Sequence, residues 1–387
     1  MKYRTLGRTG LQVSEIGLGC EGFKEENGQM TARLIDIADQ AGINLIDLYT
    51  PDPLVRKSLG EALKGRRDRF VLQAHLCSIW KNGQYQRTRD PDEVQEGFET
   101  MLSQLQTKWV DIGMIHYVDS EQDWQQIVSG PLMAYALQLK RQGRIRWIGL
   151  SSHNPAAAMT AVRSGLIDVL MFSVNPCYDL QPASEDVEQL WAQESYAKPL
   201  INMDPQREQL YELCRNEGVG ITVMKVFGGG DLLDETLSPA ARALSPLQCI
   251  HYALDRPGVA SVLPGAHSKA QLQECLRYET AGEQEKDYAA ALASFPHISW
   301  EGHCMYCGHC APCPKDIPIA SVIQFLNLAK AQGTVTETVR EHYGLLKHKA
   351  SECIQCHACE RRCPFHVDIT ECMRQAAALF GKEGIAR

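Results

Sequence analysis

The sequence predicts an α/β protein in which a (β/α)8 barrel is followed by a small, cysteine-rich helical domain. Eight short apolar runs, suited to strands covered on both faces, alternate with amphipathic segments over residues 1–282. Many of these segments end in glycine, the residue best suited to close a helix in the left-handed conformation. Eight strand–helix units in succession favour a closed barrel over the alternative, a doubly wound open sheet. We therefore place the barrel at 1–282 and the second domain at 283–387.

The expected strands follow one another with helical patterns between them. They are 13–19, 44–49, 69–75, 109–118, 144–152, 169–175, 220–226 and 259–265. The stretch YRTLGRTGLQVS, which precedes the first unit, predicts a small hairpin beneath the barrel with its turn from Gly7 to Gly10. The stretch from Cys177 to Met203 is longer than an ordinary strand–helix loop, so we expect an insertion above the barrel mouth that shapes a substrate pocket.

Composition argues against several classes of partner. The 387 residues include 39 Lys and Arg against 47 Asp and Glu, a formal charge of −8, and no basic block for nucleic acid or an anionic membrane. The N-terminus lacks the apolar stretch of a signal peptide, and no apolar run is long enough for a membrane span. We expect a cytoplasmic protein with reduced thiols, in which clustered cysteines bind metal rather than form disulfides.

Ionisable side chains gather where the expected strands end, which is where catalytic groups lie in a barrel of this kind. The candidate catalytic residues are Asp47, Tyr49, His75, His116 and Lys225. Asp47 and Tyr49 are two positions apart, so as strand residues they point the same way. A lone histidine near a strand end is as often structural as catalytic, but two histidines beside an Asp–Tyr pair favour an active site.

Two loops after later strands were candidates for binding an anion. The segment KVFGGGDLL (225–233) lacks the spacing of phosphate-binding motifs, so a tight loop is the better interpretation. The segment LPGAHSKAQL puts Gly265, Ser268 and Lys269 at the start of a helix after the last strand, where many barrels bind phosphate. An ordinary capped helix explains that segment equally well.

The barrel resembles the aldo/keto reductase family, and the whole chain looks like the branch of that family with a C-terminal ferredoxin-like module. The resemblance is carried by YRTLGRTGLQVSEIGLG, NLIDLY, DIGMIHYVD, IRWIGLSSHNP and LPGAHSKAQL. It implies the interconversion of a small carbonyl compound and its alcohol with a nicotinamide cofactor, using an Asp, Tyr, Lys and His tetrad on the barrel rim. Asp47 matches the aspartate of that tetrad, and His116 matches the histidine.

The sequence departs from the family at the other two tetrad positions. Tyr49 follows Asp47 by two residues rather than five, and His75 stands where the family has its lysine. A lysine cation helps a tyrosine to act as an acid by favouring its phenolate, and a histidine supplies that charge only when protonated. Either His75 or His116 is alternatively the proton donor itself, and Lys225 is the candidate to restore the missing cation.

The positions that contact the nicotinamide cofactor in the family are also altered. Ser151–Ser152 stands for the family's Ser–Asn pair, Met171 for its glutamine, and Cys275 for the asparagine that contacts adenine. NAD(P)H is therefore a candidate cofactor rather than a required one. The candidate cofactor-binding residues are Ser151, Ser152, Asn175, Gly265, Ser268 and Lys269.

Two cysteine runs distinguish the end of the chain. The second, Cys353, Cys356, Cys359 and Cys363 followed by proline, has the C-x2-C-x2-C-x3-C-P spacing of bacterial ferredoxins with two [4Fe–4S] clusters. The first run, Cys304, Cys307, Cys310 and Cys313, is one residue shorter before its last cysteine. On the ferredoxin pattern the last cysteine of each run crosses over, so one cluster takes Cys304, Cys307, Cys310 and Cys363 and the other takes Cys353, Cys356, Cys359 and Cys313. Zinc fits less well, because structural zinc usually takes two separated pairs of ligands.

The sequence thus predicts an oxidoreductase in which two [4Fe–4S] clusters relay electrons to or from a small-molecule substrate at the barrel mouth. A ferredoxin or another donor is the expected electron partner, with NAD(P)H as the alternative. Since a hydride carrier moves two electrons and a cluster normally moves one, the mechanism stays open between ordinary carbonyl reduction and a ferredoxin-coupled reaction. Two further hypotheses are a lyase or isomerase barrel with structural clusters, and an electron-transfer protein with a non-catalytic barrel.

Overall fold

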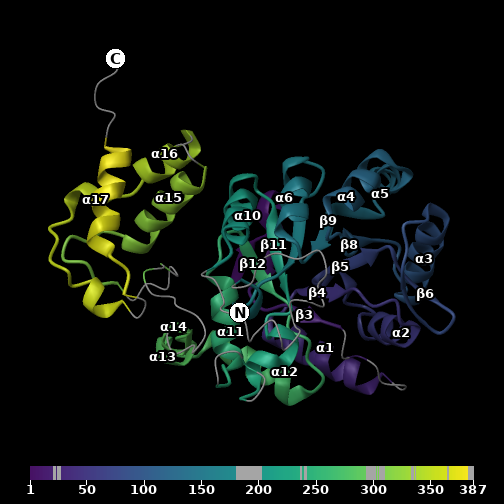
Figure 1. Cartoon of the computed structure of the whole chain (residues 1–387). Coiled ribbons are helices and arrows are strands. Elements are labelled where there is room, and N and C mark those ends of the chain that lie inside the picture. Colours follow the sequence, from purple (N-terminus) through teal and green to yellow (C-terminus); the bar gives the residue numbers. More distant parts are fainter. Residues whose placement is uncertain are drawn as a thin grey trace.

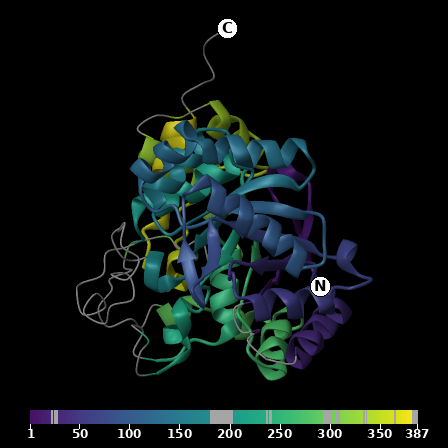
Figure 2. The ribbon, with the colours of Figure 1, turned by 90° about the vertical axis from the view of Figure 1, so that its right-hand side faces the viewer.

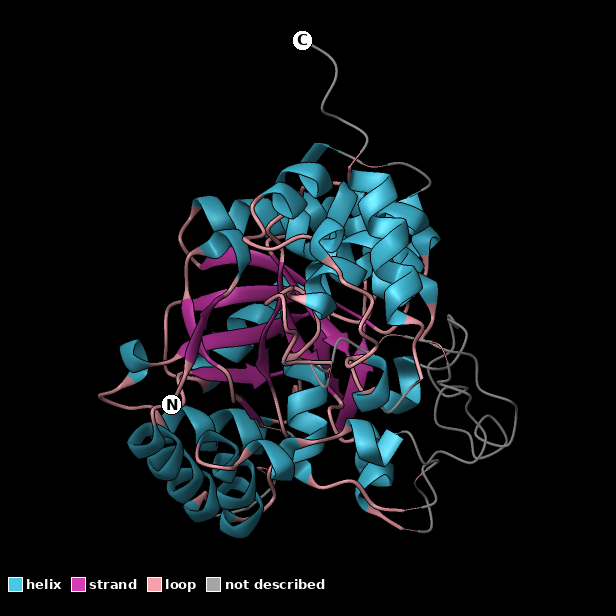
Figure 3. Cartoon of the chain, turned by 90° about the vertical axis from the view of Figure 1, so that its left-hand side faces the viewer, coloured by secondary structure: helices cyan, strands magenta, loops and turns pink. Residues whose placement is uncertain are grey.

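The structure is a computed structural model that describes residues 1–20, 23, 28–179, 203–235, 238, 242–292, 302, 304, 310–332, 335, 337–363 and 366–381. Eight parallel strands occupy the middle of the larger body, and helices lie outside them (Figures 2 and 3). The strands are β3 (Leu18–Gly19), β4 (Leu45–Leu48), β5 (Val71–Leu76), β8 (Val110–Ile115), β9 (Ile145–Ser152), β10 (Val169–Ser173), β11 (Gly220–Met224) and β12 (Val259–Val262).

The strands pair in the order β12-β11-β10-β9-β8-β5-β4-β3, and all of these pairs are parallel. The two ends of this sheet meet through parallel bridges of Ile16 with Val262 and of Gly19 with Gly265. The backbone N–H of Gly17 donates to the carbonyl of Val262 at 2.8 Å across the same seam. The predicted (β/α)8 barrel is therefore confirmed, and the open doubly wound sheet is wrong.

The helices of the barrel begin where the sequence supplies capping residues. Asp52, Asp90, Asn154 and Asp204 each accept backbone N–H groups of the following turn, and each is followed by a proline. The helices that surround the strands are α1 (Gln29–Ala41), α2 (Pro53–Ala62), α3 (Pro91–Gln104), α4 (Glu121–Ser129), α5 (Pro131–Arg141), α6 (Pro155–Arg163), α7 (Pro176–Asp179), α10 (Pro205–Asn216), α11 (Pro246–Leu254) and α12 (Lys269–Leu276).

A hairpin closes the floor of the barrel, as the sequence predicted. Strands β1 (Tyr3–Thr5) and β2 (Gln12–Ser14) pair antiparallel, and their turn is a short 3-10 helix from Gly7 to Thr9. Gly7 has φ +50°, and a Cβ atom there would lie 2.3 Å from the carbonyl oxygen of Gly218. Only glycine fits this left-handed position against the backbone at the start of β11.

A second hairpin, which the sequence analysis did not anticipate, is inserted after β5. It consists of β6 (Ser78–Lys81) and β7 (Gln84–Arg87), joined by Asn82 and Gly83 with φ of 54° and 78°. Asn-Gly with both residues in the left-handed region is the preferred two-residue hairpin turn. The hairpin packs on α3 (Figure 1), where a Cβ atom on Gly97 would approach the Cγ2 atom of Ile79 to 2.6 Å.

The insertion predicted between Cys177 and Met203 is described only at its ends. Helix α7 forms its start, with Asn175 accepting the backbone N–H groups of Tyr178 and Asp179, and residues 180–202 lie outside the described part of the chain. The backbone N–H of Asp204 donates to the carbonyl of Asp179 at 2.7 Å. The two described ends of this segment therefore meet beside β10.

Three helices form a separate body at the C-terminal end, beside α10 of the barrel (Figure 1). They are α15 (Ile319–Gln332), α16 (Glu337–Gly344) and α17 (Ile369–Phe380). Before them, α13 (Glu283–Lys286) and α14 (Ala289–Leu292) lie against the barrel. The Tyr288 hydroxyl between them donates to Asp255 at 2.9 Å and accepts from Arg256 at 3.0 Å.

The contact between barrel and C-terminal body contains a buried carboxyl group. Glu212 on α10 is 2% exposed and pairs with Arg215 at 2.5 Å, and Arg215 in turn reaches Gln324 and the ring of Phe325 on α15. The pKa of Glu212 is raised to about 7, mainly because the carboxyl is buried; Arg215 opposes the rise, and Glu208 adds to it. The folded protein therefore holds Glu212 partly protonated at neutral pH.

We expect Glu212→Gln to stabilise the protein at pH 8 by about 1–3 kcal/mol and to change little at pH 4.5. Because the pKa of Glu212 is higher in the folded state than in the unfolded state, the folded protein binds more protons than the unfolded chain at pH values between these two pKa values. Stability is thus lost as the pH rises toward about 7, and a neutral amide escapes that loss. Urea unfolding at both pH values measures the effect, with Glu217→Gln at the exposed position directly after the same helix as control. Equal effects of the two variants at pH 8 would contradict the expectation.

Candidate active site and cysteine cavity

Asp47, His75 and His116 come together at the C-terminal ends of three neighbouring strands, β4, β5 and β8. The Nε2 atom of His75 lies 3.1 Å from Oδ1 of Asp47, and its Nδ1 atom lies 2.7 Å from Nδ1 of His116. Asp47 also accepts a hydrogen bond of 2.8 Å from the side chain of Gln73, which is held by the hydroxyl of Thr222 at 3.1 Å. All three candidate residues are at most 7% exposed, so a polar chain is buried in the barrel mouth.

The electrostatics of this chain keep His116 neutral. Burial lowers the pKa of His116 well below its ordinary value, and His75, Arg89 and His153 lower it further. On the other side of Asp47, burial raises the pKa of the Cys20 thiol well above its ordinary value, and the Asp47 charge adds to the effect. Cys20 is thus an inert thiol beneath the site, whereas His116 is an uncharged imidazole able to accept a proton.

Two tyrosines lie next to the histidine pair. The ring of Tyr49 is stacked near His116, with a centroid distance of 6.0 Å and an interplanar angle of 16°. Tyr85, which the sequence analysis missed, places its hydroxyl 2.9 Å from Nε2 of His116. The signal that could have revealed it is the Asn82–Gly83 pair, since a hairpin there folds Tyr85 back over the rim. The structure thus offers a tyrosine on the inserted hairpin in addition to the predicted Tyr49.

The predicted Lys225 follows β11 and has φ +55°. Its charge acts on His153. Burial is the main reason why the pKa of His153 is lowered; Asp119 opposes this lowering, and the charge of Lys225 adds to it. His153 is bound to Asp119 through Nδ1 at 2.9 Å. Lys225 therefore acts electrostatically on His153 at the rim, and its role as the cation of the catalytic group stays a prediction.

The serines and the asparagine predicted to bind a cofactor make hydrogen bonds within the protein. Ser151 accepts from the backbone N–H of Tyr117 at 2.8 Å, and Ser152 donates to Asp119 at 3.1 Å. Asn175 donates to the carbonyl of Lys225 at 2.8 Å and accepts from the N–H of Tyr178 at 3.0 Å. These polar groups stabilise the loops after β8, β10 and β11.

The loop after β12 has the hydrogen bonds of an ordinary capped helix. Ser268 accepts from the N–H of Gln271, and Gln271 accepts from the N–H of His267 at 2.7 Å, before the helix that begins at Lys269. Gly265 pairs with Gly19 at the seam of the barrel, and a Cβ atom there would touch nothing within 4 Å. This leaves space beside Gly265 at the mouth.

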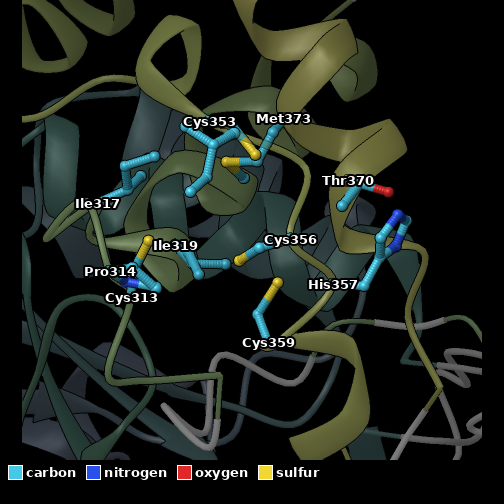
Figure 4. A pocket seen from close by; sticks show the side chains of 11 residues that line it. Cys313, Pro314, Ile317, Ile319, Cys353, Cys356, His357, Cys359, Thr370 and Met373 are labelled. Carbon is cyan, nitrogen blue, oxygen red and sulfur yellow. The ribbon is translucent and has the colours of Figure 1, made fainter.

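Four cysteines from both runs line one cavity in the C-terminal body (Figure 4). They are Cys313 of the first run and Cys353, Cys356 and Cys359 of the second. The rest of the lining is mostly apolar: Pro314, Ile317, Ile319, Ile354, His357, Thr370 and Met373. The structure therefore brings together the four residues that the ferredoxin pattern assigned to one cluster.

The remaining cysteines of the two runs are described in part. Cys304, Cys310 and Cys363 are partly buried, and Cys307 lies outside the described residues. Arg362, next to Cys363, donates to the carbonyls of Cys310 and Pro312 at 2.6 and 2.7 Å, which joins the second run to the first. The cysteines of the described part of the chain form no disulfides, and no group of three or more His, Cys, Asp or Glu side chains described there is arranged to hold a metal ion.

Comparison with known proteins identifies the barrel. Residues 15–243 match the Aldo/keto reductase family. The chain belongs to that family. An oxidoreductase of Bacillus subtilis, YqkF, is 26% identical over 305 residues, covering 76% of this chain and 96% of that protein. L-galactose dehydrogenase of Arabidopsis thaliana is 25% identical over 306 residues, covering 71% and 86%. An aldo-keto reductase of Bacillus halodurans in its holo form shares the fold with a TM-score of 0.60 and 22% identity over 77% of this chain and 97% of that one.

Family membership makes the chain an oxidoreductase, and it confirms the resemblance that the barrel sequence indicated. NAD(P)H, the usual cofactor of aldo/keto reductases, is compatible with this membership, as is a small-molecule substrate. Within the described residues, no helix has the length and apolar character that a membrane span requires.

Proposed function

We propose that the chain is an iron–sulfur oxidoreductase of aldo/keto reductase type. In this proposal a barrel over residues 1–282 interconverts a small carbonyl compound and its alcohol at its mouth. A ferredoxin-like domain over residues 283–387 holds two [4Fe–4S] clusters that relay electrons. A cytoplasmic location is part of the proposal, because thiols of this kind stay reduced there.

The observation that carries the proposal is the cavity lined by Cys313, Cys353, Cys356 and Cys359. A cubane puts iron and sulfide between its four thiolates, so its cysteines surround a space instead of meeting at a point. That arrangement fits four cysteine side chains which line one cavity. The apolar walls fit as well, because they limit the access of water to a cluster. A second cluster would be held by Cys304, Cys307, Cys310 and Cys363.

When bound, the clusters would supply one-electron transfer between a partner and the barrel. Cys356 and its neighbour Ile354 are exposed, and Ile354 is 57% exposed, so the proposed cluster lies near the surface. Such a surface supports docking of a ferredoxin or a similar electron donor. NAD(P)H is the second candidate source of electrons; with Ser152 and Asn175 engaged inside the protein, Gly265 offers the open space at the mouth.

Anaerobic purification tests the proposal directly. We expect about eight iron and eight sulfide per chain, a brown colour, and an electron paramagnetic resonance signal after reduction. Cys359→Ser is expected to lose about half of the iron. Cys372→Ser, on α17 and outside the cavity lining, is the matched control and is expected to keep all of it. Zinc in place of iron, or full iron in Cys359→Ser, would contradict the proposed cluster site.

Titration with NADPH and with reduced ferredoxin separates the two electron sources. Saturable quenching of NADPH fluorescence supports a nicotinamide site at the barrel mouth. Reduction of the iron–sulfur clusters by reduced ferredoxin, without binding of NADPH, supports the ferredoxin route.

A further inference from the structure

The buried polar chain at the barrel mouth has a defined hydrogen-bond direction. An ionised carboxylate only accepts hydrogen bonds, so Nε2 of His75 carries the hydrogen that faces Asp47. In the arrangement in which His75 has a single N–H, its Nδ1 accepts, and Nδ1 of His116 donates to it. Nε2 of His116 then accepts, and the partner that faces it, at 2.9 Å, is the hydroxyl of Tyr85. Each step follows from the one before it.

We infer that Tyr85 is the catalytic residue that exchanges a proton with the substrate oxygen, and that His116, His75 and Asp47 form the relay behind it. This inference rests on the proposed interconversion of a carbonyl compound and its alcohol, and it assigns the acid–base group of that reaction. Tyr85 lies on the hairpin inserted after β5 and not at the end of a barrel strand.

Tyr49 has no place on this relay, because both ring nitrogens of His116 are already committed. Nδ1 faces His75 at 2.7 Å and, at 3.5 Å, the hydroxyl of Ser151, and Nε2 faces Tyr85 at 2.9 Å. The backbone carbonyl of Tyr49 accepts from the hydroxyl of Ser78 at 2.7 Å, which ties the base of the hairpin to the end of β4. Tyr49 therefore helps to position the hairpin, and its ring packs against the histidines.

The hairpin is anchored well enough to hold Tyr85 in place. Its first residue is fixed through Ser78, and Arg87 on its second strand donates to the carbonyl of Tyr117 at 3.2 Å. Arg89, just beyond the hairpin, donates to the carbonyls of His116 and Tyr117 and pairs with Asp123 at 2.6 Å. Tyr85 is nevertheless 44% exposed as a residue, so one side of it faces the relay while another faces solvent.

The surrounding charges suit a proton donor. Burial raises the pKa of Tyr85, whereas Arg87 and Arg89 oppose the rise, so the hydroxyl is protonated at neutral pH but faces two cations that stabilise a phenolate. The lowered pKa of His116 keeps its Nε2 free to accept. The titratable and charged groups that face the relay are Cys20, Tyr49, Cys77, Arg87, Arg89, Tyr117, Asp123 and His153.

In alcohol oxidation the relay takes up one proton. The hydroxyl proton of the substrate passes to Tyr85, the Tyr85 proton to Nε2 of His116, and the Nδ1 proton of His116 to Nδ1 of His75. The Nε2 proton of His75 then passes to Asp47, which becomes neutral. The carbon-bound hydrogen of the substrate would leave with its two electrons as hydride to a nicotinamide cofactor, the two-electron acceptor that this step requires, and the C=O bond forms. In carbonyl reduction every step runs in reverse, and the substrate oxygen takes its proton from Tyr85.

The same chain of groups therefore works in two directions that differ by one bound proton. With Asp47 ionised, every hydrogen points inward and the relay accepts a proton; with one more proton, every hydrogen points outward and the relay donates. We expect kcat/KM for oxidation to rise with pH and kcat/KM for reduction to fall, with one shared apparent pKa of the four groups.

Nuclear magnetic resonance of the full-length holoprotein with 15N-labelled histidine tests the relay without any substrate. Among the 12 histidines, His75 and His116 are assigned with His75→Gln and His116→Gln. We expect opposite neutral tautomers, Nε2–H for His75 and Nδ1–H for His116. In Tyr85→Phe the Nε2 signal of His116 should move, and in Gln84→Ala, a change on the same hairpin, it should stay. Equal tautomers, or an unmoved signal in Tyr85→Phe, overturn the relay.

Turnover of small aldehydes and ketones with NADPH or reduced methyl viologen tests the catalytic role of Tyr85. We expect Tyr85→Phe to lower kcat/KM about 10²–10⁴-fold, the usual contribution of general acid–base catalysis, and Gln84→Ala to leave it within about twofold. Full activity of Tyr85→Phe in an iron-loaded, active protein overturns the inference while the proposed function stands. If no iron or turnover is found, the proposed function fails, and the histidine tautomers still decide the relay.

Discussion

Replacing Arg207 by methionine is expected to destabilise the protein by about 3–5 kcal/mol, the usual effect of removing one partner of a buried ion pair. Arg207 and Asp179 are both fully buried, with their side chains 3.3 Å apart. Burial already raises the pKa of Asp179, and Arg207 is the neighbour that opposes this most. Without the guanidinium, the Asp179 carboxylate still accepts from the hydroxyls of Tyr211 and Tyr252, at 2.6 and 2.7 Å, and these neutral groups do not replace the lost charge.

The loss of stability in Arg207→Met should depend on pH, because protonation removes the unpaired charge of the buried Asp179 carboxylate. In Arg207→Met the folded-state pKa of Asp179 lies further above its unfolded value, so the folded protein binds more protons and the deficit shrinks as the pH falls. Urea unfolding at pH 8 and pH 5 measures both effects. Arg141→Met, at an exposed position at the end of α5, is the control and should cost less than about 0.5 kcal/mol. A deficit as small as that of the control would show that the pair is not needed for stability.

Arg207 also connects this pair to the barrel mouth. It donates to the carbonyl of Ser173 at 2.8 Å and to that of His153 at 3.2 Å, at the ends of β10 and β9. Carbonyls at strand ends have lost their partners in the sheet, so a buried guanidinium with several donors suits them. The stability of the pair and the geometry of the rim are therefore linked.

The barrel was predictable because its strands carry their own signal. A run such as VLMFS (169–173) is mostly apolar and buried throughout, as is typical of a parallel strand covered on both faces. The meeting of Asp47, His75 and His116 followed from the same reasoning, since the ends of neighbouring parallel strands lie on one edge of the barrel. The spacing of the cysteine runs likewise predicted the set that lines the C-terminal cavity.

The parts that could not be predicted depend on where single side chains turn. Tyr85 reaches His116 only because the chain folds back at Asn82 and Gly83, and the number of residues between β5 and α3 does not reveal which side chain returns to the rim. Lys225 follows β11 with φ +55°, and its charge lowers the pKa of His153, which no sequence pattern indicates. Ser152 has a polar partner in Asp119 that no sequence pattern indicates.

Replacing Asp47 by asparagine is expected to lower kcat/KM about 10²–10⁴-fold in both directions of the proposed reaction. The Oδ1 atom of Asp47 accepts from both Gln73 and His75, and an amide oxygen in the same place accepts both hydrogen bonds. The variant thus retains the hydrogen-bond pattern but loses the basic group at the inner end of the relay. The proton that leaves Tyr85 then has no final acceptor, so the chemical step slows while the fold is retained.

The histidine tautomers show whether the loss has this cause. In Asp47→Asn, His75 should keep its Nε2–H form and His116 its Nδ1–H form, and the thermal midpoint should change by only a few degrees. Gln73→Leu is the comparison, since it removes a hydrogen bond to Asp47 but leaves the carboxylate in place, and it should lose less activity. If Asp47→Asn were as active as the unchanged protein, protons would have to leave Tyr85 by another route. The exposed side of Tyr85 makes solvent that route, and the histidine pair would then orient the tyrosine without carrying its proton.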